Sequence, residues 1–181
     1  IWDMDGVLID SGPFHFQAWR EIFARERRIE FTWEVFQRTF GWRNPEMLRD
    51  VLGPHTSQAE IDFLAGVKEA RYRDLVRANS ARLLLPGVIE CLARLRQDGW
   101  RQAVASSAPA ENVAVILEAL PLRDYFGAVV TAEDVARGKP DPAPFLTAAQ
   151  RLGVAPNRCV VVEDAPAGIE AARRAGMACI G

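Results

Sequence analysis

Seven residues that can carry out chemistry follow the strands that this 181-residue sequence predicts. In chain order they are Asp3 and Asp5, Ser106 and Ser107, Lys139, and Glu163 and Asp164. Four carboxylates in one partly buried crevice would repel one another strongly unless a cation neutralised them. Hard oxygen ligands of this kind suit Mg²⁺, which keeps some of its bound water and also binds oxygens of a substrate phosphate. Beside such a cation one carboxylate can attack phosphorus, so we expect phosphoryl transfer through an aspartyl-phosphate, with Mg²⁺ as cofactor.

The second half of the chain alternates helical and strand patterns, and this alternation would bring those residues together. Helical spacing of apolar residues falls at 88–95, 113–120, 145–152 and 168–175, and apolar strands are predicted at 100–105, 128–131, 159–162 and 177–180. Continuous apolar strands that alternate with helices predict a doubly wound, Rossmann-like parallel α/β sheet. Ligands bind such sheets at the carboxyl ends of the strands, where the polar residues lie.

Residues 12–82 lack this alternation. Helical spacing recurs at residues 14–23 and 61–75, and the segment between them is broken by Gly41, Pro45, Gly53 and Pro54. We therefore expect a helical domain at residues 12–82, inserted after the first strand. The α/β core domain would be discontinuous and comprise residues 1–11 and 83–181.

The composition excludes several classes of function. The chain has 22 Lys and Arg against 24 Asp and Glu, so it has no net basic field that would hold a nucleic acid. Its apolar runs are too short to cross a bilayer, and no basic segment followed by an apolar one marks it for secretion. Its three cysteines are scattered, as is typical of reduced core residues. We expect a cytoplasmic monomer that binds neither nucleic acid nor membrane.

Both ends of the chain are short for such a fold. Only Ile1 and Trp2 precede Asp3, whereas a central strand usually has about five residues. The chain also stops where a last strand would normally lead into another helix. We therefore expect the sequence to be a stretch of a longer protein.

The motifs resemble those of the haloacid dehalogenase (HAD) superfamily. They are Asp3-Met4-Asp5-Gly6-Val7-Leu8-Ile9-Asp10-Ser11, Val104-Ala105-Ser106-Ser107, Lys139-Pro140 and Val162-Glu163-Asp164, in this order. The insert after the first motif resembles the helical C1 cap of subfamily I. Nearly the whole chain is similar to the β-phosphoglucomutase-like phosphatases and mutases. The resemblance implies a HAD-like fold with a C1 cap and a small phosphorylated substrate.

The resemblance also implies the roles of the carboxylates. Asp3 would be the nucleophile and a Mg²⁺ ligand. Asp5 would be the general acid and base, and its backbone carbonyl would also bind the metal. Glu163 and Asp164 would complete the metal site. Without the other motifs, a Glu-Asp pair here would equally suit the N-terminus of the following helix through its dipole.

Other motif residues would contact the phosphoryl group or the substrate. By the resemblance, Ser106 and the amide of Ser107 hold the transferring group, and Gly6 and Ala108 lie beside the substrate. Lys139 would neutralise the charge on that group and on Asp3, since phosphoryl transfer depends on positioning and fixed positive charge. On its own, a Ser-Ser pair after a strand is more often a turn or a helix cap.

Two cations lie on apolar faces of the predicted insert helices. His15 and Lys68 each share a face with large apolar residues. Such side chains often serve structure alone, with an apolar stem along the core and a polar tip in water. The functional alternative is that both point at the substrate, because the mutases that the chain resembles have a histidine and a lysine at matching places.

A loop of the insert bears on the choice between phosphatase and mutase. Those mutases hold the second phosphate with an arginine at the position that, counted from Gly41, is Asn44 here, with Arg43 beside it. A mutase must grip a bisphosphate at both ends, so the loss of a fixed guanidinium weakens the mutase reading unless Arg43 replaces it. Trp42 offers a surface that would pack on a sugar ring or cover the core.

The leading prediction is therefore a Mg²⁺-dependent phosphatase acting on a sugar phosphate, and the alternative is a β-phosphoglucomutase-type mutase. Haloalkanoate dehalogenases share the fold but need no metal, so Asp5 and the Glu163-Asp164 pair argue against that chemistry. A receiver domain carries its aspartate on a middle strand and has no helical insert in its first crossover. A catalytically silent binding protein on the same fold stays open, because fold does not fix function.

Overall fold

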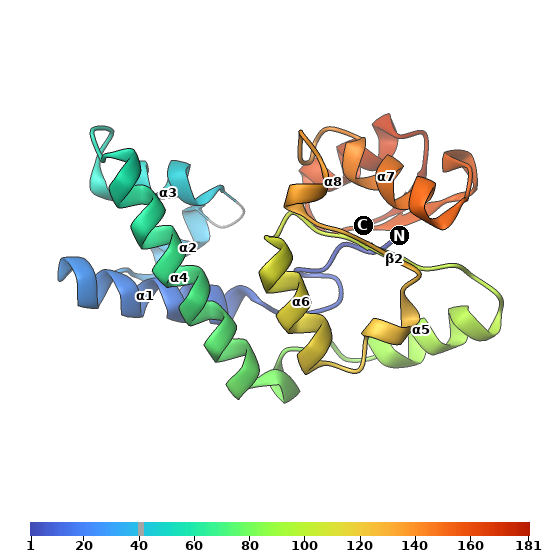
Figure 1. The fold of residues 1–181 in the computed structure, drawn as a ribbon, viewed down its shortest axis with the longest axis horizontal. Helices are drawn as coiled ribbons and strands as arrows, with labels where there is room; N and C mark the ends of the chain where they lie inside the picture. Colours follow the sequence, from blue (N-terminus) through green and yellow to red (C-terminus); the bar gives the residue numbers. More distant parts are fainter. Residues whose placement is uncertain (40–41) are drawn as a thin grey trace. The chain divides into compact units, whose positions relative to one another are not determined.

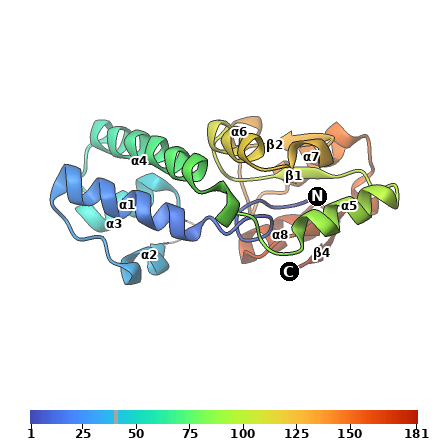
Figure 2. The same ribbon diagram turned by 90° about the horizontal axis from the view of Figure 1, so that it is seen from below.

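The computed structural model describes residues 1–39 and 42–181. Gly41, from which the loop position was counted above, lies outside these residues. The chain divides into two compact units, which we call the α/β unit and the helical unit (Figures 1 and 2). The α/β unit comprises Ile1–Ser11 and Asn79–Gly181, and the helical unit comprises Gly12–Ala78.

Short parallel strands and the first residues of the chain form the sheet of the α/β unit. The strands are β1 (Ala103–Ala105), paired with β2 (Ala128–Val130), and β3 (Val160–Val162), paired with β4 (Ala178–Ile180). Trp2 lies between β1 and β3: its N–H donates to the Ala103 carbonyl at 2.8 Å, and its own carbonyl accepts from the Ala105 N–H at 2.9 Å. On the other side, the Asp3 N–H donates to the Val162 carbonyl at 3.0 Å. Asp3 therefore follows the middle segment of the sheet.

Helices cover both faces of this sheet, with α7 and α8 on one face and α5 and α6 on the other (Figure 1). They are α5 (Val88–Gln97), α6 (Ala110–Ala119), α7 (Ala143–Leu152) and α8 (Pro166–Arg174). The unit also contains the 3₁₀ turns η1 (Ser80–Arg82), before α5, and η2 (Arg123–Tyr125), η3 (Ala132–Asp134) and η4 (Pro156–Arg158), which lie between the later helices and strands. Phe145 and Ala149 of α7 and Ala172 of α8 are buried in one cluster with Val130 and Val161 of the strands. This is the doubly wound α/β arrangement that the sequence predicts.

The first strand of this region begins later than its apolar pattern predicts. The expected range is 100–105, but β1 contains only Ala103–Ala105. Gly99 has a φ of +83°, and the Trp100 N–H donates to the Leu95 carbonyl of α5 at 2.9 Å. Trp100 therefore belongs to the turn that leaves the helix, and its side chain is 51% exposed.

The helical unit is held together by an aromatic and aliphatic core. Its helices are α1 (Gly12–Arg27), α2 (Trp33–Thr39), α3 (Asn44–Leu52) and α4 (Gln58–Ala78). The buried core residues are Trp19, Ile22, Phe23, Phe31, Phe36, Met47, Leu48, Ile61 and Leu64. Ion pairs also join α1 to α4, between Arg27 and Glu60 and between Glu21 and Arg71. None of the helices within residues 1–39 and 42–181 is long and apolar enough to cross a membrane.

Candidate active site

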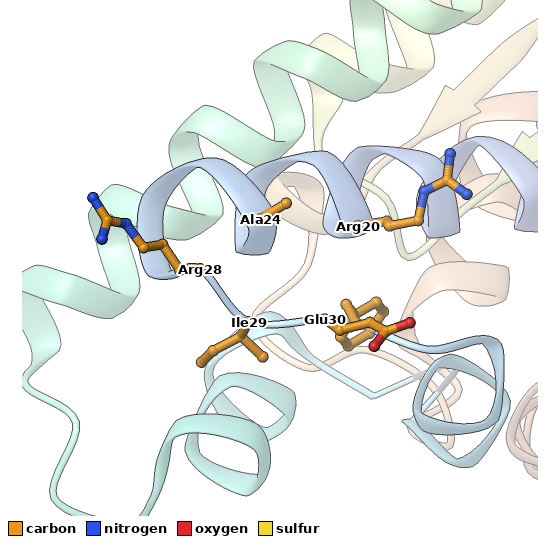
Figure 3. Close-up of a pocket in the computed structure, with 6 residues that line it drawn as sticks. Arg20, Ala24, Arg28, Ile29 and Glu30 are labelled. Atoms are coloured by element: carbon orange, nitrogen blue, oxygen red, sulfur yellow. The ribbon is translucent and has the colours of Figure 1, made fainter.

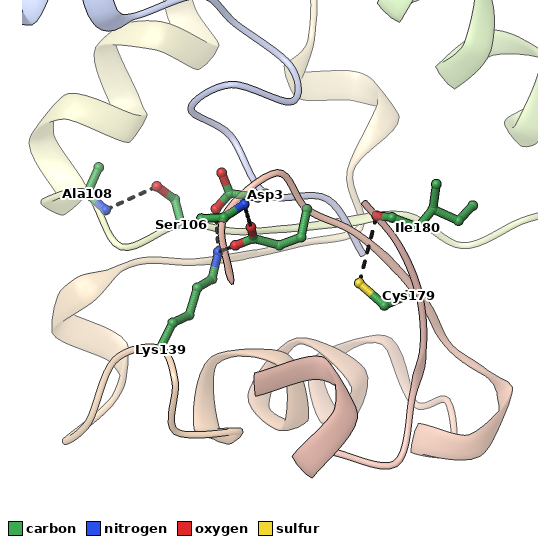
Figure 4. A network of polar contacts seen from close by, with 8 residues as sticks. Asp3, Ser106, Ala108, Lys139, Cys179 and Ile180 are labelled. Atoms are coloured by element: carbon green, nitrogen blue, oxygen red, sulfur yellow. Dashed lines mark hydrogen bonds and ion pairs between the residues drawn. The ribbon is translucent and has the colours of Figure 1, made fainter. Parts of the chain in front are cut away.

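Asp3 is buried at the carboxyl end of the middle segment of the sheet, with 7% of its surface exposed. Lys139 reaches its carboxylate, and Lys139 Nζ donates both to Asp3 Oδ1 and to Glu163 Oε1, the latter at 2.5 Å (Figure 4). The Lys139 side chain is itself only 7% exposed. The structure therefore joins three of the predicted residues in one buried network of charges.

Glu163 is held on both of its oxygens. Oε1 accepts from Lys139, and Oε2 accepts from the Ala165 N–H at 2.7 Å, just before α8. Gly168 of α8 lies directly against this carboxylate. Glu163 therefore orients Lys139 and accepts from a backbone N–H just before α8, whose N-terminus has no side-chain capping bond among the described residues.

Ser106 follows β1, on the strand next to Asp3. Its side chain is buried, and Oγ accepts from the Ala108 N–H at 3.0 Å (Figure 4). Because that bond uses only the oxygen, the hydroxyl hydrogen remains able to donate to an anion. Ser107, the next residue, is exposed.

Gly6 and Asp164 approach each other closely. Gly6 has a φ of +87°, which glycine adopts easily and other residues rarely do. A Cβ atom at Gly6 would lie only 2.2 Å from Asp164 Oδ2. Glycine at this position therefore permits the turn after Asp5 and leaves room for the Asp164 carboxylate.

Within the helical unit, the structure brings together four of the polar residues near the start of α1, on α3 and on α4. Lys68 Nζ lies 2.8 Å from His15 Nδ1 and donates to Glu69 Oε1, also at 2.8 Å. Asn44 Nδ2 donates to the same Glu69 oxygen at 2.9 Å. Trp42 and Arg43, which precede Asn44, are exposed.

A family comparison identifies the chain. The sequence model of the haloacid dehalogenase-like hydrolase family matches residues 1–176 of this chain. The chain belongs to this family. It is therefore a HAD-like hydrolase, and an enzyme.

Individual relatives of this HAD-like hydrolase cover almost all of its length. It is 38% identical to the β-phosphoglucomutase of Bacillus subtilis, over 100% of this chain and 81% of the relative. It is 35% identical to a fructose-1-phosphate phosphatase of Escherichia coli, over 98% of this chain and 92% of the relative. A solved HAD hydrolase of family IA, variant 3, from Entamoeba histolytica matches with a TM-score of 0.89 at 27% identity, covering 98% of this chain and 80% of that one.

The charges around Asp3 in this hydrolase do not balance. Burial raises the pKa of Asp3 to about 7, although the ammonium of Lys139 opposes the rise. The carboxylates of Asp5 and Glu163 add to it. The site therefore has a surplus of negative charge that a bound cation would relieve.

The donors present fit Mg²⁺. They are hard carboxylate oxygens, and the Asp164 carboxylate lies directly against the loop that follows Asp3 and Asp5. Among the residues described, no three His, Cys, Asp or Glu side chains already surround one point. Mg²⁺ is usually bound by one or two carboxylates and completes its shell with water and substrate oxygens.

Sequence reasoning did not single out Glu69. A buried lysine needs a counter-charge, and Lys68 is only 2% exposed, so a search for the nearest acidic residue would have been the available signal. Glu69 directly follows Lys68, however, and adjacent residues on a helix do not usually face one another. A search based on helical spacing therefore passes over Glu69 as a partner of Lys68.

The helical unit also has an open hollow of about 320 Å³ between α1 and the segment that follows it (Figure 3). It is lined by Arg20, Ala24, Arg28, Ile29, Glu30 and Phe31. None of the residues that the sequence singled out lies in its wall.

Proposed function

We propose that this hydrolase is a Mg²⁺-dependent phosphatase that acts on a small sugar phosphate through an aspartyl-phosphate on Asp3. The observation that carries this proposal is the buried Asp3 carboxylate in contact with Lys139 at the carboxyl end of the middle segment of the sheet. The relatives, a β-phosphoglucomutase and a fructose-1-phosphate phosphatase, favour a phosphorylated sugar as substrate.

The chemistry takes two steps. An oxygen of Asp3 attacks phosphorus, and the bond to the sugar oxygen breaks while Asp5 donates a proton to that leaving oxygen. Asp5 then takes a proton from water, whose oxygen attacks phosphorus and releases phosphate, so that Asp3 is restored. Both residues return to their starting states.

The surrounding groups stabilise charge rather than form bonds. The Lys139 ammonium offsets the charge of Asp3 and of the phosphoryl oxygens, and the Ser106 hydroxyl and the Ser107 N–H donate to those oxygens. Asp3, the Asp5 carbonyl, Glu163 and Asp164 are the residues that would hold Mg²⁺. When bound, the metal neutralises negative charge on the phosphoryl group.

A mutase of the β-phosphoglucomutase type is the second candidate, because of the 38% identity to that enzyme of B. subtilis. In a mutase the phosphoryl group passes to another hydroxyl of the sugar rather than to water. The bond from Asn44 to Glu69 favours the phosphatase, since Asn44 brings no positive charge to the start of α3 and its amide already has a partner.

The test is phosphate release from a panel of phosphorylated sugars and other small monoesters, with Mg²⁺ present or chelated. The panel includes β-glucose 1-phosphate with and without its bisphosphate, and the products are examined for isomers. Release from one or a few sugar phosphates that needs Mg²⁺ supports the phosphatase. Isomerisation without release supports the mutase, and neither reaction on any substrate refutes both.

A further inference from the structure

His15, Lys68 and Glu69 form a partly buried chain of polar contacts within the helical unit, and Lys68 at its centre is buried. Lys68 Nζ lies 2.8 Å from His15 Nδ1 and 2.8 Å from Glu69 Oε1. The Lys68 side chain is 3% exposed and that of Glu69 is 14% exposed. In such surroundings an ammonium needs its carboxylate, because an uncompensated buried charge is costly.

The contact with Lys68 determines where His15 carries its proton. An ammonium can only donate hydrogen bonds, so the Nδ1 atom that faces it must accept and carries no hydrogen. The single proton of the neutral ring is then on Nε2. Burial, together with the positive charge of Lys68, lowers the pKa of His15 well below its usual value, so the ring stays neutral.

The orientation of the His15 ring is also fixed. The ring stacks on that of Tyr72, with 4.0 Å between centroids and 1° between planes. Tyr72 is one turn along α4 from Lys68, so the same helix provides the stacking surface and the donor. His15 therefore has one tautomer and one orientation.

Glu69 and Asn44 hold the donor in place. Glu69 Oε1 accepts from both Lys68 and Asn44, the first residue of α3, which ties α3 to α4 at this point. We propose that Glu69 is a positioning residue: supported by Asn44, it anchors the Lys68 ammonium, so that His15 is held as a neutral ring that carries a hydrogen-bond donor on Nε2. A loss of activity on substitution of Glu69 rests on the proposed phosphatase function, whereas the anchored tautomer does not.

The tautomer can be measured on the unaltered protein. The chain has two histidines, His15 and the exposed His55, so the ring nitrogens of ¹⁵N-labelled protein give two resolvable sets of signals. We expect His15 Nδ1 to have the shift of an unprotonated nitrogen and Nε2 that of a protonated one, unchanged between about pH 6 and 8. A protonated Nδ1 in this protein would overturn the proposal without recourse to any variant.

Lys68→Met tests the source of the effect, because it keeps the length of the side chain and removes its charge and its donor. The pKa of His15 should rise, since a nearby cation is lost while the carboxylate of Glu69 remains. Its ring signals should then respond to acid at a higher pH than in the unaltered protein. Signals that respond in the same way as before would show that Lys68 does not set the state of His15.

Glu69→Gln tests the positioning role, and Glu21→Gln is the matched control. Glu21 also joins α1 to α4, and its carboxylate accepts from Arg71 at 2.5 Å and from Gln17 at 2.9 Å. In Glu69→Gln the His15 Nδ1 signal should move toward that of a nitrogen without a hydrogen bond, and kcat/KM should fall about tenfold through KM. In Glu21→Gln both should stay as they were.

Asn44→Ala provides a milder second variant, because it removes one donor to Glu69 and leaves every charge in place. A smaller shift of the same signal in the same direction is expected. Unchanged His15 signals in folded Glu69→Gln and Asn44→Ala would overturn the positioning role. Shifted signals in a protein that hydrolyses no phosphate ester would support the anchored tautomer and refute the phosphatase.

Discussion

A Cβ atom on Gly168 would lie 1.8 Å from Oε1 of Glu163, the oxygen that accepts from Lys139. Real Cβ atoms do not come that close to another heavy atom, so the position of the carboxylate depends on the absence of a side chain in α8. The helix that covers the sheet thereby helps to place the cation beside Asp3.

Gly168→Ala should therefore reduce activity while leaving the fold in place. The Glu163 side chain has to move, which misplaces Lys139, and a displacement of about 1 Å in such a group lowers rates by between about 10-fold and 100-fold. The measurements are phosphate release and thermal unfolding. Full activity would show that the Glu163 carboxylate can move without displacing Lys139.

Gly66→Ala is the control for that substitution. Gly66 lies within α4, and a Cβ atom there would meet nothing within 4 Å. Alanine favours helix over glycine, so the free energy of unfolding should rise by about 0.5–1 kcal/mol. Phosphate release should be unaffected.

Asp3→Asn should abolish turnover, because the amide is not a nucleophile toward phosphorus. We expect phosphate release to fall about 1000-fold or more, while thermal unfolding remains cooperative. Lys139 keeps its contact with Glu163 in this variant, so the buried ammonium retains a partner. Appreciable residual turnover in a clean preparation would remove Asp3 from the role of nucleophile.

Mg²⁺ should raise the melting temperature of the protein, since a ligand that binds only the folded state stabilises it. Asp164→Asn should remove most of this shift, because it replaces a carboxylate beside Gly6 with a neutral amide. Asp124→Asn, in the 3₁₀ turn η2 before β2, should retain it. An equal shift in both variants would exclude Asp164 from the metal site.

Asp134 should make the free energy of unfolding depend on pH. Its hydrogen bond with Arg151, and then that with the Thr131 N–H, lower the pKa of its carboxyl from 3.8 to about 2. A lowered folded-state pKa gives stability that is complete above the unfolded value of 3.8 and is lost as the pH falls through about 2. Asp134→Asn should therefore cost stability at pH 7, and the difference from the unaltered protein should shrink between about pH 4 and 2.

A double-mutant cycle of Asp134→Asn with Arg151→Met isolates the pair. Both side chains are partly exposed, so we expect a coupling of about 0.5–1 kcal/mol in the free energy of unfolding at neutral pH. The coupling should shrink as the pH falls from about 4 through about 2. A coupling that persists in acid would mean that the two residues interact through packing rather than charge.

The sequence was sufficient to predict the family and the α/β fold, because both follow from local patterns. Polar residues at strand ends indicated Asp3, Lys139 and Glu163, and their side chains do lie in contact. Parallel strands bring their carboxyl ends to one edge of a sheet, so this proximity follows from topology alone. The chemical roles of these residues stay predictions.

The contacts within the helical unit were harder to predict. The pattern placed His15 and Lys68 on apolar faces, but the bond between them depends on how α1 and α4 pack. Glu69 depends further on α3, which brings Asn44 to the same carboxylate oxygen. Such contacts between helices are set by side-chain packing, which apolar spacing alone does not specify.

The hydrogen bonds of Trp2 and Asp3 to β1 and β3 also bear on how the enzyme is made. Asp3 leaves the ribosome well before Ala103 and Val162, whose carbonyls receive the hydrogen bonds of this segment. Contacts between residues so distant in sequence form late and slow the folding of a chain, because a long loop must close first. Asp3, the proposed nucleophile, is thus synthesised before β1 and β3, but it is fixed in the sheet only after both strands have been made. A nascent chain that stalls before β3 therefore has no assembled site.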